Sequence, residues 1–132
     1  FREPLSGFDF ELPVSREQGV PLLGYRKVVE AFILAMECDG EALGDDRVLT
    51  LPSRQYLVRD MISSLERVAE EKGITLGKII DQPDALVIKV VEGWPIGTES
   101  KRAEALGMSA DSCVEEVIEA YLDDFHEFPG RA

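Results

Sequence analysis

Hydrophobic and polar residues alternate near the start of the chain, with apolar side chains at Phe8, Phe10, Leu12 and Val14. This period of two predicts a half-buried strand, and Pro13 predicts that the strand lies at an edge or ends there. The runs VPLLGY (20–25) and RVLTLP (47–52) predict two further short extended segments. ITLGKII (74–80) is also predicted to be a strand.

The next segment, DALVIKVVEG (84–93), leaves two structures open. Its β-branched residues favour a strand, whereas its length after Pro83 and Asp84 allows a helix. In the stretch that follows, EGWPIGTESKRAEALGM (92–108), Trp94 and Pro95 are predicted to hold the chain against the core, and a short helix is predicted after them. We expect Trp94 to bury a large apolar area and Thr98 or Ser100 to cap a helix that Gly107 ends.

In three longer stretches the apolar residues recur at the spacing of a helix rather than at every second position. Residues 26–38 are predicted to form an amphipathic helix, and a second helix is predicted to begin after the cap Ser53 and to end at Gly73. A third begins at Ser112 and Glu115, which have capping-box spacing, and packs against the core. The apolar stripe of the first helix consists of Val28, Val29, Phe32, Ile33 and Met36. Strands and helices together predict an α/β fold, α+β-like as an isolated piece, with four or five helices.

Length and charge narrow the classes of function. A chain of 132 residues, 45% of them hydrophobic, fits one domain. The formal net charge of −12 would repel phosphate backbones and anionic lipid, so we expect neither a nucleic-acid nor a membrane partner. No run approaches the roughly 20 apolar residues of a membrane helix. Cys38 and Cys113 lie in apolar helical patterns, which favours buried free thiols in a reduced, cytoplasmic setting.

Motifs for catalysis or metal binding are missing. His126 is the single histidine and is expected to be exposed near the end of the chain, so no His-based triad or metal cluster is predicted. The acidic run at 39–46 lacks the ligand spacing of a calcium loop. The sequence contains neither G-x-G-x-x-G nor a phosphate loop, and no tyrosine has a lysine four residues later. We therefore predict no catalytic, metal or cofactor site.

Several segments, taken in order, resemble one protein family: FREPLSG, a strand ending in LPVS, GYRKVVEAFILAME, DDRVLTLPS, and VVEGWP followed by SKRAEALGM. Together they are similar to the C-terminal half of the extended short-chain dehydrogenases/reductases, the NAD-dependent epimerase/dehydratase family. Within it they resemble the D-erythronate dehydrogenase-like branch. The similarity extends over residues 1–125, and the order of the segments carries most of it.

The resemblance implies a partner and a cofactor outside this chain. In such enzymes an N-terminal Rossmann half binds NAD and supplies a Tyr-x-x-x-Lys pair, and the C-terminal part covers the substrate. FREPLSG has neither a signal peptide nor an initiator Met, so we expect the chain to begin inside a longer protein. Residues 1–127 would be the substrate-binding portion of a sugar-acid dehydrogenase or of a nucleotide-sugar epimerase/dehydratase-like enzyme, inactive alone, and residues 128–132 a frayed tail.

Three arginines are candidates for binding the substrate carboxylate, because a guanidinium suits that group. Arg26 lies at a junction between a strand and a helix, where α/β proteins commonly bind ligands. Arg102, with Lys101, heads the short helix, and Arg2 lies beside Phe1. For each, a structural or exposed arginine is the alternative. Many relatives have an acidic residue near position 26 and a basic one a few residues earlier, whereas this chain has Tyr25, Arg26 and Lys27. This difference weakens the assignment of a substrate-binding role to Arg26 from the resemblance.

A different class of function stays open on the sequence alone. The chain could be an autonomous, non-enzymatic acidic interaction domain, which would fold by itself in a two-state transition. A severed half would instead expose an apolar patch, which we expect at Phe8, Phe10, Val20 and Leu22. The sequence also leaves open whether the protein is a homo-oligomer.

Overall fold

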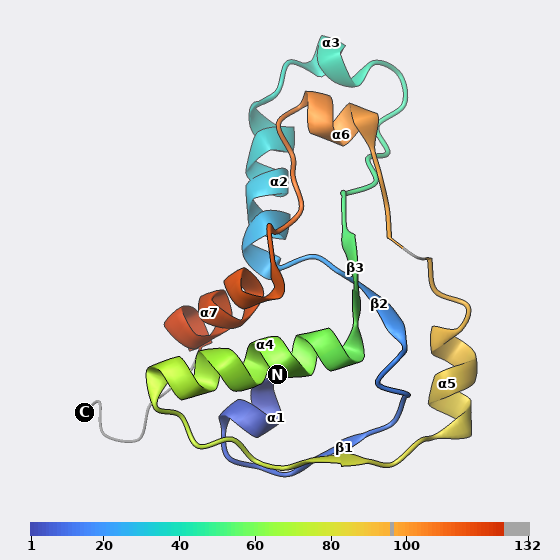
Figure 1. Cartoon of the computed structure of the whole chain (residues 1–132). Coiled ribbons are helices and arrows are strands. Elements are labelled where there is room, and N and C mark those ends of the chain that lie inside the picture. Colours follow the sequence, from blue (N-terminus) through green and yellow to red (C-terminus); the bar gives the residue numbers. More distant parts are fainter. Residues whose placement is uncertain (96, 126–132) are drawn as a thin grey trace.

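The computed structural model describes residues 1–95 and 97–125 (Figure 1). In this part of the chain the elements are α1 (Arg2–Leu5), β1 (Phe10–Leu12), β2 (Gly19–Leu22), α2 (Tyr25–Glu37), α3 (Gly40–Leu43), β3 (Arg54–Leu57), α4 (Val58–Lys72), β4 (Ile79–Asp81), α5 (Ala85–Val91), α6 (Lys101–Ala105) and α7 (Val114–Phe125). The predicted α/β class is confirmed. The described residues form more helices than the four or five expected, because the four-residue helices α1 and α3 add to them.

The strands form two small sheets that join distant parts of the chain. β1 pairs in parallel with β4, with Glu11 opposite Ile80, and β2 pairs antiparallel with β3, with Val20 opposite Tyr56. In Figure 1, α4 crosses the middle of the molecule, α1 and β1 lie below it, and α2, α3 and α6 lie above it.

Helix α4 contributes to two of the three apolar clusters. Leu65 and Val68 pack against α1 and α7 in the first cluster, and Val58 and Ile62 join β1 and α5 in the second. The third cluster, around Ala103, lies between α2 and α6. Burial of large aliphatic side chains contributes about 1.5–3 kcal/mol each, so α4 stabilises both of the clusters to which it contributes.

The start of α4 differs from the prediction. Residues 54–57 pair with β2, so the helix begins at Val58 rather than after Ser53. The first N–H groups of α4 are satisfied by loop carbonyls: Val58 N–H donates to Gln18 at 2.9 Å and Arg59 N–H to Arg16 at 2.9 Å. Tertiary acceptors therefore replace the predicted side-chain cap.

Two other boundaries were predicted correctly. Gly73 ends α4 with φ +66°, a left-handed conformation that suits glycine. The Ser100 hydroxyl caps α6 by accepting the Ala103 N–H at 3.2 Å. The segment 84–93, left open by its pattern, contains helix α5, because the Asp84 carboxylate accepts the N–H groups of Leu86 and Val87.

Several sequence predictions were wrong for tertiary reasons. Residues 47–52 have no strand assignment, because no neighbouring strand pairs with them in the described chain. Trp94 is 48% exposed and is not the buried anchor that we expected. At the start of α7 the Ser112 N–H donates to Glu116 at 2.6 Å, and Glu115 forms an ion pair with Arg67 instead of closing a capping box.

We predict that Leu65→Ala, which opens a cavity between α4 and α7, lowers the free energy of unfolding by about 2–5 kcal/mol. The exposed Leu86 offers a matched control, and Leu86→Ala is expected to change it by less than about 0.5 kcal/mol. Urea denaturation followed by circular dichroism measures both. Equal effects of the two variants would contradict this description of the core.

Candidate functional site

An apolar depression of about 200 Å³ lies where α1, β1, β2, β4 and α4 meet. Its lining residues are Phe1, Pro4, Phe10, Leu12, Val20, Val58, Met61, Ile62, Leu65 and Ile79. It includes two of the four positions at which we predicted an exposed apolar patch. Of the other two, Phe8 is exposed and Leu22 packs against the first cluster.

Arg2 lies on α1, beside the rim residues Phe1 and Pro4 of this depression. Its side chain is exposed and has no hydrogen-bond or ion-pair partner among the described residues. In a chain with net charge −12, Arg2 is thus a cation that forms no ion pair with the residues that the structure describes. Its geometry leaves the guanidinium available to an anion.

Arg26 lies at the first turn of α2 and faces the end of α7. Its Nε donates to Asp124 Oδ2 at 3.0 Å, and its Nη2 lies 3.4 Å from Asp123 Oδ2. The Tyr25 hydroxyl donates to Ala120 O at 3.0 Å and also contacts Asp124. The Arg26 guanidinium is therefore already paired with two carboxylates, those of Asp123 and Asp124.

The pKa values in this cluster follow from its contacts. The hydrogen bond from Arg26 lowers the pKa of Asp124, and the same bond raises the pKa of Arg26. Burial, followed by the contact with Asp124, raises the pKa of Tyr25. The cluster is a charge-neutralising link between α2 and α7, and Tyr25 is not activated as a base.

An acid-rich depression of about 240 Å³ adjoins Arg26 and contains one buried carboxylate. Asp111 accepts the Gly24 N–H at 2.6 Å and caps the start of α2. A side chain at position 24 would place its Cβ 2.5 Å from Asp111 Oδ1, so this contact requires glycine. Sequence analysis missed Asp111, because its partner lies 87 positions away and the local pattern does not distinguish it.

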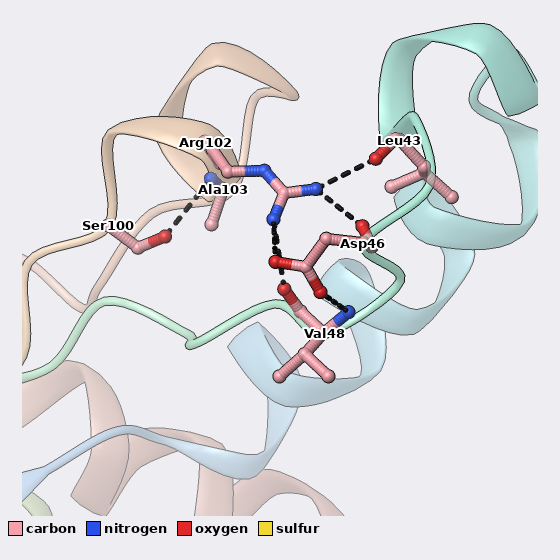
Figure 2. Close-up of polar contacts among 6 residues, drawn as sticks. All are labelled: Leu43, Asp46, Val48, Ser100, Arg102 and Ala103. Carbon is pink, nitrogen blue, oxygen red and sulfur yellow. Dashed lines mark hydrogen bonds and ion pairs between the residues drawn. The ribbon is translucent and has the colours of Figure 1, made fainter.

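Arg102 holds the loop between α3 and β3 in place. Figure 2 shows its guanidinium enclosed by Leu43, Asp46 and Val48. Nη1 donates to Asp46 Oδ2 at 2.8 Å and Val48 O at 3.3 Å, and Nη2 donates to Leu43 O at 2.8 Å and Asp46 O at 2.6 Å. The N–H of Val48 and the Arg102 charge lower the pKa of Asp46. These contacts account for most of the donors on Arg102.

The three predicted arginines do not form one site. Arg2 lies on α1, below α4 in Figure 1, whereas Arg26 on α2 and Arg102 on α6 lie above it. Arg26 is paired with α7 and Arg102 with the loop after α3, so these two guanidinium groups have different partners. A substrate role for any of them stays a prediction.

A search of residues 1–95 and 97–125 found no group of three or more His, Cys, Asp or Glu side chains that could bind a metal ion. The same part of the chain contains no helix long and apolar enough to cross a membrane. His126 and the predicted tail at 128–132 lie outside the described residues. Cys38 and Cys113 are free and half-buried.

Comparison with known proteins identifies relatives over nearly the whole chain. The D-erythronate dehydrogenase of Cupriavidus necator is 37% identical over 123 residues, which are 93% of this chain and 37% of that protein. The D-erythronate dehydrogenase of Haemophilus influenzae is 32% identical over 122 residues, 92% of this chain and 38% of that protein. The chain thus spans less than two fifths of the length of these relatives. No protein-family model matches it.

Solved structures agree with these matches. The nucleoside-diphosphate-sugar epimerase from Agrobacterium tumefaciens has a TM-score of 0.81 and 34% identity, covering 93% of this chain and 35% of its own. A GalE-like L-threonine dehydrogenase from Cupriavidus necator has a TM-score of 0.74 at 15% identity, covering 92% and 42%, which shows the fold alone.

Fold and matches are consistent with a C-terminal piece of an extended short-chain dehydrogenase/reductase. Within that family, the relatives to which this chain is similar are D-erythronate dehydrogenases. The resemblance found in the sequence is confirmed.

We predict that Arg102→Gln loosens the loop at 43–48, because four donated hydrogen bonds are removed or weakened. Hydrogen exchange of the Val48 amide, which donates to Asp46 at 3.0 Å, should accelerate about tenfold or more. Lys101→Gln is the matched control, and it should leave this rate unchanged. Unchanged exchange in both variants would show that Arg102 does not hold the loop.

Proposed function

We propose that this chain is the substrate-side portion of an NAD-dependent oxidoreductase whose substrate is a small sugar acid, with D-erythronate as the first candidate. The observation that carries the proposal is the pair of matches to D-erythronate dehydrogenases, each covering over nine tenths of this chain and less than two fifths of the relative. The family's Tyr-x-x-x-Lys pair is absent from this sequence, which fits a chain that covers substrate without performing the chemistry.

NAD would be bound by another part of the parent protein. The glycines of this chain do not form a G-x-G-x-x-G turn, so its residues do not fit a dinucleotide site. The cofactor would accept a hydride from a substrate carbinol carbon. The tyrosine and lysine of the dinucleotide-binding half would handle the proton, and residues 1–127 would cover and orient the sugar acid in a cytoplasmic enzyme.

The contacts rank the three arginines as ligands for the substrate carboxylate. Arg102 donates to its own loop, and Arg26 is paired with Asp123 and Asp124. Arg2 has no partner among the described residues and adjoins the apolar depression. We therefore favour Arg2, since binding a carboxylate there breaks no existing ion pair.

A hybrid enzyme tests the proposed function. We expect that joining this chain to the part of the Cupriavidus necator D-erythronate dehydrogenase outside the match gives a protein that reduces NAD⁺ in the presence of D-erythronate. Absorbance at 340 nm follows NADH formation, and the 132-residue chain alone is the control and should be inactive. A folded hybrid that binds NAD⁺ but oxidises neither D-erythronate nor other four- to six-carbon sugar acids would favour the autonomous interaction domain.

In the same hybrid, Arg2→Gln should raise KM for D-erythronate about 10- to 100-fold, because a hydrogen bond to a charged group contributes about 1.5–3 kcal/mol. KM for NAD⁺ should not change. Arg26→Gln and Arg102→Gln are the comparison variants. A larger rise in KM with Arg26→Gln would move the carboxylate site to α2, and no rise with any of the three would remove all three arginines from the substrate site.

A further inference from the structure

The relatives of this chain are named for two classes of substrate. Two are D-erythronate dehydrogenases, and a third, a solved structure, is a nucleoside-diphosphate-sugar epimerase. A sugar acid offers one carboxylate as its anionic group, whereas a nucleotide-linked sugar offers a diphosphate. The cations that the chain leaves free to pair with such groups therefore bear on which class the parent enzyme accepts.

Two carboxylates from the last turn of α7 face the single guanidinium of Arg26. Arg26 Nε lies 3.0 Å from Asp124 Oδ2, and Arg26 Nη2 lies 3.4 Å from Asp123 Oδ2. Because these carboxylates belong to the same chain, they compete with a dissolved anion at high effective concentration. A phosphate group that reached Arg26 would have to displace one carboxylate and would still meet the other.

Contacts of Tyr25 hold this turn of α7 in place independently of Arg26. The Tyr25 hydroxyl donates to Ala120 O at 3.0 Å, and its ring meets the Phe125 ring edge-on with the centroids 5.1 Å apart. An edge-to-face aromatic pair adds stability beyond the area it buries. The two carboxylates therefore stay close to Arg26 even when an ion pair with it opens.

The depression of about 240 Å³ beside Arg26 opposes anions further. Its lining contains the cations Arg26 and Lys27, and Lys27 Nζ is itself paired with Glu30 Oε2 at 2.9 Å. The acidic residues of the lining outnumber these cations and are Glu30, Asp111, Glu116, Glu119 and Asp123. A phosphate in this depression would lose hydration, meet like charges and find both cations already paired.

We propose that Asp123 and Asp124 are specificity-determining residues that deny Arg26 to phosphate and diphosphate groups, so that the parent enzyme discriminates against nucleotide-linked sugars in favour of free sugar acids. The proposal rests on the proposed function, because it refines the substrate class stated there. Specificity is often achieved by placing repulsive charges against the wrong ligand, and the end of α7 does so at this junction. The carboxylate of a sugar acid still has the unpaired Arg2 available on α1.

Binding of inorganic pyrophosphate to the 132-residue chain tests the proposal. Asp123→Asn combined with Asp124→Asn should raise the affinity for pyrophosphate about tenfold or more, because Arg26 then has no competing carboxylate. Isothermal titration calorimetry at low ionic strength measures this affinity, since salt screens the interaction. Circular dichroism checks that the helices remain.

Two further variants identify the cause of the gain. Glu70→Gln combined with Glu71→Gln, on the exposed side of α4, changes the net charge by the same amount and is the matched control. This control should leave the affinity for pyrophosphate nearly unchanged. Adding Arg26→Gln to the Asp123 and Asp124 substitutions should remove the gain.

The outcomes separate this proposal from the proposed function. A folded Asp123 and Asp124 variant that binds pyrophosphate no better than the unchanged chain would show a purely structural link and overturn the proposal, even if the hybrid enzyme oxidises D-erythronate. An equal gain in the α4 control would assign the effect to net charge and also overturn it. A gain that depends on Arg26, together with an inactive hybrid, would support the exclusion of diphosphates and count against the proposed function.

Discussion

The packing of α4 along its length is the constraint on which the remainder of the structure depends. Leu65 and Val68, in the second half of this helix, pack against α7 and α1, and Val58 and Ile62, near its start, pack against β1 and α5. The two sheets have two strands each and could not be stable by themselves. They persist because α4 gives each sheet an apolar surface to pack against.

Away from α4, polar links join the elements in addition to the third apolar cluster. Asp111 caps α2 through Gly24, Tyr25 and Arg26 join α2 to Asp124 on α7, and Arg102 secures the α3 loop. Exposed ion pairs contribute little stability, typically 0–1 kcal/mol, so these links fix orientation more than they add free energy. On α2, the apolar side chains of Val29, Phe32, Ile33 and Met36 are not covered by any of the described residues.

A core around α4 and an exposed apolar face on α2 agree with the proposal that this chain is one portion of a longer enzyme. Its core is built around α4. Among the described residues, α2 and the strand-like segment 47–52 join neither of the two sheets. Arg26 is paired with Asp123 and Asp124 of α7, whereas Arg2 has no ion-pair partner among the described residues and lies beside the apolar depression.

Local sequence determined the elements whose causes are local. The apolar period predicted α2 and α7, Gly73 ended α4, and Ser100 capped α6, because each depends on side chains within a few positions. Tertiary structure alone decided that 54–57 pairs with β2, that Asp111 meets Gly24, and which face of α2 stays exposed. These outcomes depend on partners tens of residues away, and periodicity specifies that a helix has an apolar face without specifying what covers it.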